Sequence, residues 1–402
     1  MSKPIVVVEL SHSAVKVLIG YELCNQPIVL YASKTPLRGA ISEGHIVNAP
    51  LLVGAVKKAL DEAAQRTKLP IKEIVLALPS NGQQIFQANR SSTVVSPAAR
   101  VEQIDVKNVI NIIRRDAQLE GTTIVGIIPD LYALEDGKRF IEPPIGYTSP
   151  TLTIQAKIHL LPTKLCDEYA NVIEEAGYQL VKAFLDTYAV SELFKSYPNV
   201  PNKYILADLG AQKSSLSLIA NDSLFGTIIL NKGGDDLISH IQKTFNLDAK
   251  LAEELIIKYG YDARILNYQT KIADGVSSTN IKQPIYVDTL GEAITSWLSE
   301  YISLFHVGLK QLIAEQGGNE ALGDYPLVII GGLADLNGFT TYFYEHETKE
   351  NVSFITPTSF GARNGTYAVT LGLIKAYTRY KNEIGDEHVK VTNISRNNEP
   401  RI

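Results

Sequence analysis

The chain has 402 residues, more than a single hydrophobic core usually organises, so we expect at least two packed units. Hydrophobic residues make up 45% of it and charged residues 20%, as in an ordinary globular protein. The formal net charge of −5 argues against nucleic acid as the main partner, because phosphate binding needs a basic surface. The two cysteines, Cys24 and Cys166, lack metal-ligand spacing. No stretch approaches the roughly 18 apolar residues of a membrane span, so we expect a cytoplasmic protein with at most peripheral membrane contact.

The chain begins with a predicted strand pair. Residues 5–10 form an almost continuous apolar run, a short polar turn follows, and residues 15–19 return as a second strand. A third strand is expected near 28–32. The pattern then predicts a helix over 55–66 and a strand over 74–78.

The segment 81–160 has a pattern of its own. Residues 83–95 alternate like a half-buried strand, and 101–119 form a predicted amphipathic helix. Its apolar face consists of Val101, Val106, Val109, Ile110, Ile113 and Ala117. Further strands are expected at 124–128, 131–134 and 152–160. We interpret the whole segment as an inserted subdomain.

The second half of the chain repeats the plan of the first. An apolar strand at 204–209 carries Asp208 at its end, as the first strand carries Glu9, and residues 215–219 return as a second strand. The two acids lie about half the chain length apart. Such an internal repeat predicts a duplicated α/β domain with a cleft between the copies.

Helices account for most of the remaining pattern. They are predicted at 164–176, 237–245, 249–259, 287–313 and 367–380, with another starting at Leu336. Asp186 and Asp248 are expected to cap helices. A strand at 327–330 runs directly into Gly331 and Gly332. Residues from 381 onward are polar, and we expect a frayed tail there.

Two strand–acid–turn–strand hairpins, with a later strand that ends in Gly-Gly, are the arrangement of the actin/Hsp70/sugar-kinase superfamily. Within it, the sequence resembles the bacterial cell-division family FtsA along nearly all of its length. The segments that carry the resemblance are Arg38–Asn48, Ile74–Ser80, Ile128–Leu134, Pro143–Gly146 and Gln155–Leu161. Each of these segments lies just before the inserted segment, within it, or at its end. FtsA places a subdomain there, and actin and Hsp70 do not.

The resemblance implies an α/β fold of duplicated actin-like (ribonuclease H-like) domains with an inserted 1C-type (SHS2) subdomain. The family's subdomains would then occupy 1–80 (1A, first part), 81–160 (1C), 161–204 (return to 1A and crossover helix), 205–232 (2A, first part), 233–325 (2B) and 326–380 (rest of 2A and the closing 1A helix), followed by a polar tail at 381–402.

The resemblance also implies a site for ATP and Mg²⁺. In this fold, tight turns direct backbone N–H groups at the phosphates, and an acid at the strand end holds the metal and its water. The residues implied are Glu9, Ser11, His12 and Ser13 of the first hairpin; Asp208, Gly210, Ala211, Gln212 and Lys213 of the second; and Gly234, Glu253, Gly331, Gly332 and Leu333. Asp208 would hold Mg²⁺ through water, Glu253 would reach the ribose, and the Gly-Gly turn would pass under the ribose and base.

Both hairpins depart from the family pattern. Ser11 and His12 stand where Gly and Thr are usual, and Ser215 stands where the second hairpin usually has a later Asp. Lys213 could offer a positive charge to a phosphate in partial compensation. We therefore predict a weak nucleotide site, no catalytic residue and at most a very weak ATPase. A plain surface hairpin remains the alternative for each hairpin taken alone, and an exposed helical face remains the alternative for Glu253.

The function implied by the resemblance is that of a scaffold. FtsA proteins bind ATP, polymerise, and hold FtsZ at the inner face of the membrane at the division site. The FtsZ C-terminal tail docks on 2B, and 1C contacts neighbouring subunits and other division proteins. Trp297, Tyr301, Leu304 and Phe305 are candidate anchors for that tail, with core packing as the alternative.

FtsA normally ends in an amphipathic membrane helix, and residues 389–402 have no apolar stripe of useful length. Either the sequence stops before such a helix or the protein reaches the membrane through a partner. Two other functions stay open: a PilM-type actin-like adaptor of pilus assembly, and a sugar or acetate-type kinase of the same superfamily. A kinase needs a catalytic Asp and a substrate pocket near the first hairpin, and the sequence indicates neither.

Overall fold

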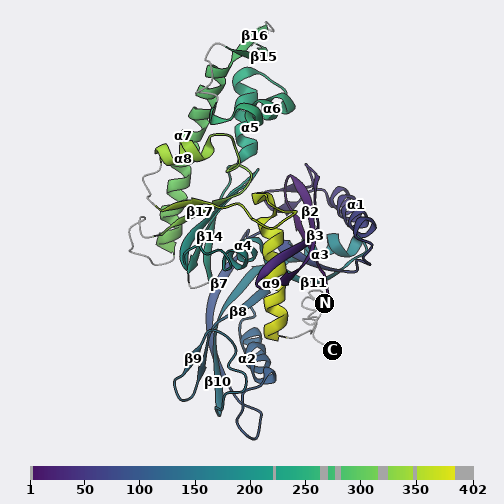
Figure 1. Ribbon diagram of the computed structural model, residues 1–402, viewed down its shortest axis with the longest axis vertical. Helices are drawn as coiled ribbons and strands as arrows, with labels where there is room; N and C mark the ends of the chain where they lie inside the picture. Colours follow the sequence, from purple (N-terminus) through teal and green to yellow (C-terminus); the bar gives the residue numbers. More distant parts are fainter. Residues whose placement is uncertain are drawn as a thin grey trace. The chain divides into compact units, whose positions relative to one another are not determined.

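The computed structural model describes residues 3–220, 223–262, 270–276, 282–315, 325–346 and 351–384. Contacts between residues divide the chain into two compact units (Figure 1). Unit 1 contains residues 1–202, 219–226 and 357–402, and unit 2 contains residues 203–218 and 227–356. The finer division into 1A, 1C, 2A and 2B stays a prediction.

Unit 1 contains a mixed sheet with the order β11-β6-β1-β2-β3. The strands are β1 (Ile5–Leu10), β2 (Ala14–Leu23), β3 (Gln26–Pro36), β6 (Glu73–Leu78) and β11 (Gln179–Leu185). The first three are antiparallel to one another, whereas β6 runs parallel to β1 and β11 runs parallel to β6. The strands predicted from the first 78 residues are confirmed, and β11 was not predicted. A short hairpin, β4 (Ile41–Ser42) and β5 (His45–Ile46), follows β3.

Helices cover this sheet in two packed pairs. α1 (Ala49–Thr67) contacts α3 (Thr163–Glu175), and α4 (Asp186–Phe194) packs along α9 (Ala368–Ile384). Because α9 continues to Ile384, the expectation that a frayed tail begins at residue 381 is wrong. The rest of the predicted tail, 385–402, lies outside the described residues.

Between β6 and α3, the chain forms a second sheet with the order β7-β10-β8-β9. These strands are β7 (Gln84–Thr93), β8 (Thr122–Leu134), β9 (Arg139–Phe140) and β10 (Thr151–Pro162). The two strands predicted at 124–128 and 131–134 are one continuous strand. A register shift opposite Gln155 and Ala156 accommodates Pro129, the residue that made the sequence pattern look interrupted.

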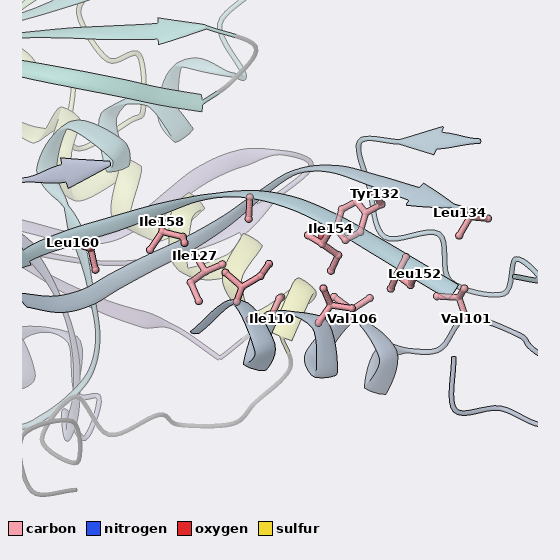
Figure 2. Close-up of a cluster of buried hydrophobic side chains, with 13 residues drawn as sticks. Val101, Val106, Ile110, Ile127, Tyr132, Leu134, Leu152, Ile154, Ile158 and Leu160 are labelled. Atoms are coloured by element: carbon pink, nitrogen blue, oxygen red, sulfur yellow. The ribbon is translucent and has the colours of Figure 1, made fainter. Parts of the chain in front are cut away.

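Helix α2 (Gln103–Asp116) lies along one face of this second sheet, and apolar side chains fill the space between them (Figure 2). The predicted face of the helix is confirmed, since Val101, Val106, Val109, Ile110 and Ile113 are buried. Asp105 fixes the start of α2. Its Oδ2 accepts a hydrogen bond from the Glu102 N–H, and its Oδ1 accepts one from the Val95 N–H, each at 2.8 Å.

Unit 2 contains a five-stranded sheet with the order β14-β13-β12-β17-β18. Its strands are β12 (Lys203–Leu209), β13 (Ser214–Ala220), β14 (Ser223–Leu230), β17 (Leu327–Ile330) and β18 (Val352–Phe354). Residues 219–226, at the far end of the β13–β14 hairpin, belong to unit 1. There the Ser223 hydroxyl bonds the Asp130 carboxylate of β8.

The rest of unit 2 is mainly helical. It comprises α5 (Gly234–Phe245), α6 (Ala249–Tyr259), α7 (Val287–Glu315), α8 (Phe339–His346) and the strand pair β15 (Lys271–Val276) and β16 (Lys282–Tyr286). Asp248 caps α6 as predicted, since its side chain accepts the Leu251 N–H at 2.9 Å. α8 begins at Phe339 rather than Leu336. In the described parts of the chain, no helix combines the length and the apolar composition needed to cross a membrane.

Candidate nucleotide-binding site

The second hairpin places Asp208 at the carboxyl end of β12, beside Ile330 of the parallel strand β17. The turn after β12 is tight, because the Gly210 N–H donates to the Lys213 carbonyl at 3.1 Å. A Cβ at Gly210 would stand 2.6 Å from that same carbonyl oxygen. Only glycine fits there. In open α/β sheets, ligands bind beyond the carboxyl ends of parallel strands, which is where Asp208 lies.

Gly331 closes the end of β17 against the second hairpin. Its φ is +103°, and a Cβ there would lie 2.5 Å from the backbone N and O of Leu209 and 2.6 Å from Asp208 Oδ1. The Leu333 N–H donates to the Leu209 carbonyl at 3.0 Å. The Gly-Gly turn and the acid of the second hairpin are therefore joined into one rigid piece of backbone.

Gly332 has a different environment. A Cβ added there would meet no atom within 4 Å, and its φ lies outside the left-handed region. Nothing in the surrounding protein requires glycine at this position. A bare backbone beside open space, next to Asp208 through Gly331, can let a flat ligand approach closely.

The start of α5 supports the second hairpin. The Gly234 N–H donates to the Gly210 carbonyl at 3.1 Å, and the Asp235 N–H donates to the Ala211 carbonyl at 2.7 Å. The Gly233 N–H in turn donates to Asp236 Oδ2 at 2.8 Å. These donors at the helix start are already engaged by protein oxygens. Gly234 thus shapes the turn, and its N–H is not directed at a ligand.

Side chains of α7 lie behind the same hairpin. The Tyr301 and Ser214 hydroxyls are 2.6 Å apart, and Ser214 also donates to the Lys232 carbonyl at 2.9 Å. Tyr301 is fully buried, and Trp297, stacked on it, is 2% exposed. Phe305 is buried as well. These three side chains pack in the core, so they are not surface anchors for a peptide, and of the four predicted anchors only Leu304 is partly exposed.

Helix α6 carries Glu253, which is half-buried. The C-terminal end of this helix is tied to the loop after the Gly-Gly turn, because the Asn337 side chain donates to the Ile257 carbonyl at 2.9 Å. The Tyr261 N–H returns a bond to the Asn337 carbonyl at 2.8 Å. α6 and the Gly-Gly loop are therefore held together within unit 2.

The first hairpin lies in unit 1, and its acid is already paired. Glu9 faces Lys16 across β1 and β2, with the Lys16 Nζ 2.6 Å from Glu9 Oε1. The other carboxylate oxygen, Oε2, is buried and accepts no hydrogen bond. Burial raises the pKa of Glu9, and the Lys16 ammonium opposes that rise.

The turn residues of the first hairpin are held by neighbouring backbone. Ser11 donates both its N–H, at 3.0 Å, and its hydroxyl, at 2.9 Å, to the Ala14 carbonyl. The His12 Nδ1 lies 2.6 Å from the Ile41 carbonyl oxygen and donates to it, and the Ser13 carbonyl accepts the Leu37 N–H at 2.9 Å. The imidazole of His12 thus faces Ile41, and its hydrogen bond ties this turn to the neighbouring backbone.

Sequence reasoning missed a polar group beside Glu9. Ser80, just after β6, donates to Asp186 Oδ1 at 2.5 Å and lies 2.9 Å from the Thr187 hydroxyl. The Asp186 charge also raises the pKa of Glu9. No local sequence signal marks this contact, because it depends on the parallel order of β1, β6 and β11, whose carboxyl ends meet at one edge. Asp186 is the first residue of α4 and not its N-cap, which is Leu185.

The structure thus places the predicted site residues in two groups. Unit 2 holds Asp208, Gly210–Lys213, Gly234 and Gly331–Leu333 in one interlocked piece, and unit 1 holds Glu9 and Ser11–Ser13. Among the described residues, no cluster of three or more His, Cys, Asp or Glu is suited to a metal ion. A metal at Asp208 would therefore need water or ligand oxygens to complete its coordination.

The sequence comparisons agree on one family, although no protein-family model matches the chain. The chain is 24% identical over 372 residues to the cell division protein FtsA of Streptococcus pneumoniae serotype 2 (strain D39), covering 91% of this chain and 78% of that protein. It is 20% identical over 370 residues to FtsA of Bacillus subtilis, covering 91% and 82%. With FtsA of Escherichia coli K12 the identity is 22% over 344 residues, covering 84% and 80%. The chain is a divergent relative of FtsA.

Solved structures give the fold of this FtsA relative. Its TM-score with a PilM-PilN type IV pilus biogenesis complex is 0.57 at 17% identity, covering 94% of this chain and 98% of the other. With MreB5 of Spiroplasma citri bound to AMPPNP it is 0.53 at 13% identity, covering 95% and 98%. The fold is actin-like, as the sequence predicted.

Proposed function

We propose that this FtsA relative is an actin-like cell-division scaffold that binds ATP, assembles with itself and tethers FtsZ at the division site. The similarity to FtsA over 91% of the chain carries this proposal. FtsZ would be held by its C-terminal tail on the 2B part of unit 2, about residues 233–325. The inserted segment would contact other division proteins. The protein would act at the inner face of the cell membrane, attached peripherally or through a partner.

ATP would be held by the interlocked piece of unit 2. Gly332 leaves the space beside the turn open, so the adenosine could lie against bare backbone. Asp208 would orient Mg²⁺ through water, and Lys213 would add charge near the phosphates. MreB5, which shares the fold, has been solved with AMPPNP, which supports a nucleotide as the ligand class.

Binding should be weak, and hydrolysis should be close to undetectable. The donors of Gly210, Gly234 and Asp235 are bound to protein carbonyls, so they are lost to a phosphate. Glu9 is neutralised by Lys16, so it is a poor partner for a metal ion. Each missing donor costs on the order of 1 kcal/mol.

Titration calorimetry with Mg-ATP tests the site. We expect a dissociation constant in the micromolar range or weaker. Gly332→Val should abolish the heat of binding, because its branched side chain would fill the open space beside the turn. Gly54→Val is the matched control, because Gly54 also has open space beside it but lies on α1. Tight binding that survives Gly332→Val would place the nucleotide elsewhere, and no binding by the wild type would remove ATP from the proposal.

A PilM-type pilus adaptor is the second candidate. The likeness to the PilM-PilN structure, with a TM-score of 0.57, favours it at the level of the fold. The sequence similarity to FtsA supports cell division instead. A kinase would need a catalytic Asp near the first hairpin. Asp186, the acid beside Glu9, is engaged by the Ser80 hydroxyl and by the Thr187 N–H, so the described residues give a kinase no support.

A further inference from the structure

Strand β7 forms one edge of the inserted sheet (Figure 1). Its ten residues pair with β10 from Gln84 to Thr93 without any register shift. No strand among the described residues pairs with its other side. β7 therefore presents a straight, long row of backbone donors and acceptors to its surroundings.

The hydrogen bonds around β7 show which backbone groups face outward. The Val94 N–H donates to the Pro150 carbonyl at 2.9 Å, which continues the ladder with β10. Because backbone groups alternate between the two sides of a strand, the odd-numbered residues from Ile85 to Thr93 face away from β10. The next outward N–H, that of Val95, is bound by Asp105 Oδ1 at 2.8 Å. The open row thus ends at Thr93.

This edge lacks the usual protection against pairing. Soluble proteins blunt exposed edges with proline, lysine or a bulge, and β7 has none of these. Its one charged residue, Arg90, is paired with Asp116 at 2.7 Å. An Arg90 Nη1 also donates to the Asn89 carbonyl at 2.9 Å, which leaves that oxygen a second lone pair.

We propose that β7 pairs antiparallel with β7 of a second copy of this chain, about a two-fold axis at Asn89. This arrangement keeps the outward residues in hydrogen-bonded pairs: Asn89 with Asn89, Gln87 with Ser91, and Ile85 with Thr93. The two sheets would join into one continuous sheet with both α2 helices on the same face. This pairing would be the surface through which the chain assembles with itself, so it rests on the self-assembly given in the proposed function.

Charge and burial favour a second copy as the occupant. Arg90 would stand opposite Ala88 of the second copy, so no like charges meet directly. Phe86, which is 48% exposed on the α2 side of the edge, would lie opposite Ser92 and diagonal to Val94 of the second copy. The pairing therefore covers an aromatic side chain that the single chain leaves in water.

Cysteine cross-linking tests the register in the full chain. Asn89→Cys, in a Cys24→Ser background that removes the exposed native thiol, should form a disulfide-linked dimer under mild oxidation. Facing residues of a hydrogen-bonded pair have Cα atoms about 5.5 Å apart, within reach of a disulfide. Ser91→Cys is the matched control, because the two Ser91 positions would be roughly 14 Å apart. Ser91→Cys mixed with Gln87→Cys should cross-link.

Sedimentation velocity tests the same interface without covalent cross-linking. Asn89→Lys and Asn89→Glu each place like charges opposite each other, so each variant alone should lose dimerisation by about tenfold or more, and an equimolar mixture should recover it. Circular dichroism checks that both variants fold.

Dimers that persist in Asn89→Lys, without cross-linking by Asn89→Cys, would show that self-association uses another face. A wild type that stays monomeric to about 100 µM would overturn both this interface and the self-assembly in the proposed function. ATP and FtsZ binding, measured on the same proteins, are independent of either result.

Discussion

At the scale of single residues, Glu9 and His159 are buried groups whose pKa values are shifted by burial. Glu9 sits in the first hairpin with Lys16 as its partner. His159, on β10, is 1% exposed, packs edge-on against Tyr188 at 5.3 Å, and has a buried Nε2 without a hydrogen-bond partner. Burial lowers the pKa of His159 to about 3.

Replacing Lys16 by methionine should make the protein less stable as the pH rises. A buried carboxyl with a raised pKa favours folding at low pH and loses that advantage as the pH rises through its folded pKa. Without Lys16, we expect a loss of about 2 kcal/mol at pH 8 and much less at pH 5, measured by urea denaturation. Lys34→Met, on the next strand, removes a weaker positive neighbour of Glu9, so it should give a smaller loss in the same direction. Equal losses at both pH values for Lys16→Met would contradict this account of Glu9.

His159→Phe should reduce the sensitivity to acid. A histidine whose folded pKa is lowered contributes stability that is fully present above the unfolded pKa of about 6.5 and is lost as the pH falls toward 3. Between pH 7 and 5, the wild type should therefore lose about 2 kcal/mol more than the variant. Parallel stability curves for the two proteins would show that folding does not lower the pKa of His159.

At the scale of elements, α9 connects the inserted sheet to the rest of unit 1. Arg379 on α9 pairs with Glu192 of α4 at 2.9 Å and with Glu383 at 2.7 Å. It also donates to the Pro129 carbonyl of β8 at 3.3 Å. The Gln103 side chain of α2 bonds the Glu383 carbonyl. The end of α9 is thus part of the packing of the inserted segment.

Arg379→Met should be strongly destabilising. Glu192 is 3% exposed at its side chain, and removing Arg379 leaves it with the Lys195 ion pair and the Tyr188 hydrogen bond. Loss of one member of a buried ion pair costs about 3 kcal/mol. Lys195→Met, which leaves Arg379 in place, should cost clearly less. Chemical denaturation measures the free energy of unfolding of both variants. Equal losses would mean that the contacts of Arg379 on α9 stabilise the fold no more than the Lys195 ion pair does.

The elements predicted correctly are those with strong periodicity. Helices α2 and α6 and strands β1 and β17 show it within their own residues, so no distant contact is needed to recognise them. β11 passes into α4 at Leu185–Asp186 without a glycine or proline, so no local signal separates the two. β8 was divided at Pro129 because the bulge that accommodates the proline depends on its pairing with β10.

The candidate site was predictable to a similar extent. Asp208, Gly331 and Gly332 were proposed from the resemblance, which rests on strand ends and paired glycines that leave a local pattern, and their role in binding stays a prediction. The Lys16 partner of Glu9 and the Ser80–Asp186 pair were missed, since these contacts depend on strand register and on the order of strands in the sheet. The burial of Tyr301 likewise follows from packing against Ser214, 87 positions away in the chain.

At the scale of the whole molecule, the chain combines an actin-like fold with an FtsA-like sequence. The fold alone is shared with PilM and MreB5, so it does not separate cell division from pilus assembly. The sequence similarity to FtsA, which covers 91% of the chain and 78% of the FtsA of S. pneumoniae, favours cell division. The central claim is therefore the partner, FtsZ.

Fluorescence anisotropy with a labelled FtsZ C-terminal tail peptide from the same organism tests that claim most directly. We expect saturable binding by the full-length protein with a micromolar dissociation constant. Unlabelled FtsZ should compete, FtsZ without its tail should not, and PilN should not bind. Binding of PilN together with no binding of the FtsZ tail would contradict the cell-division assignment and favour the pilus adaptor.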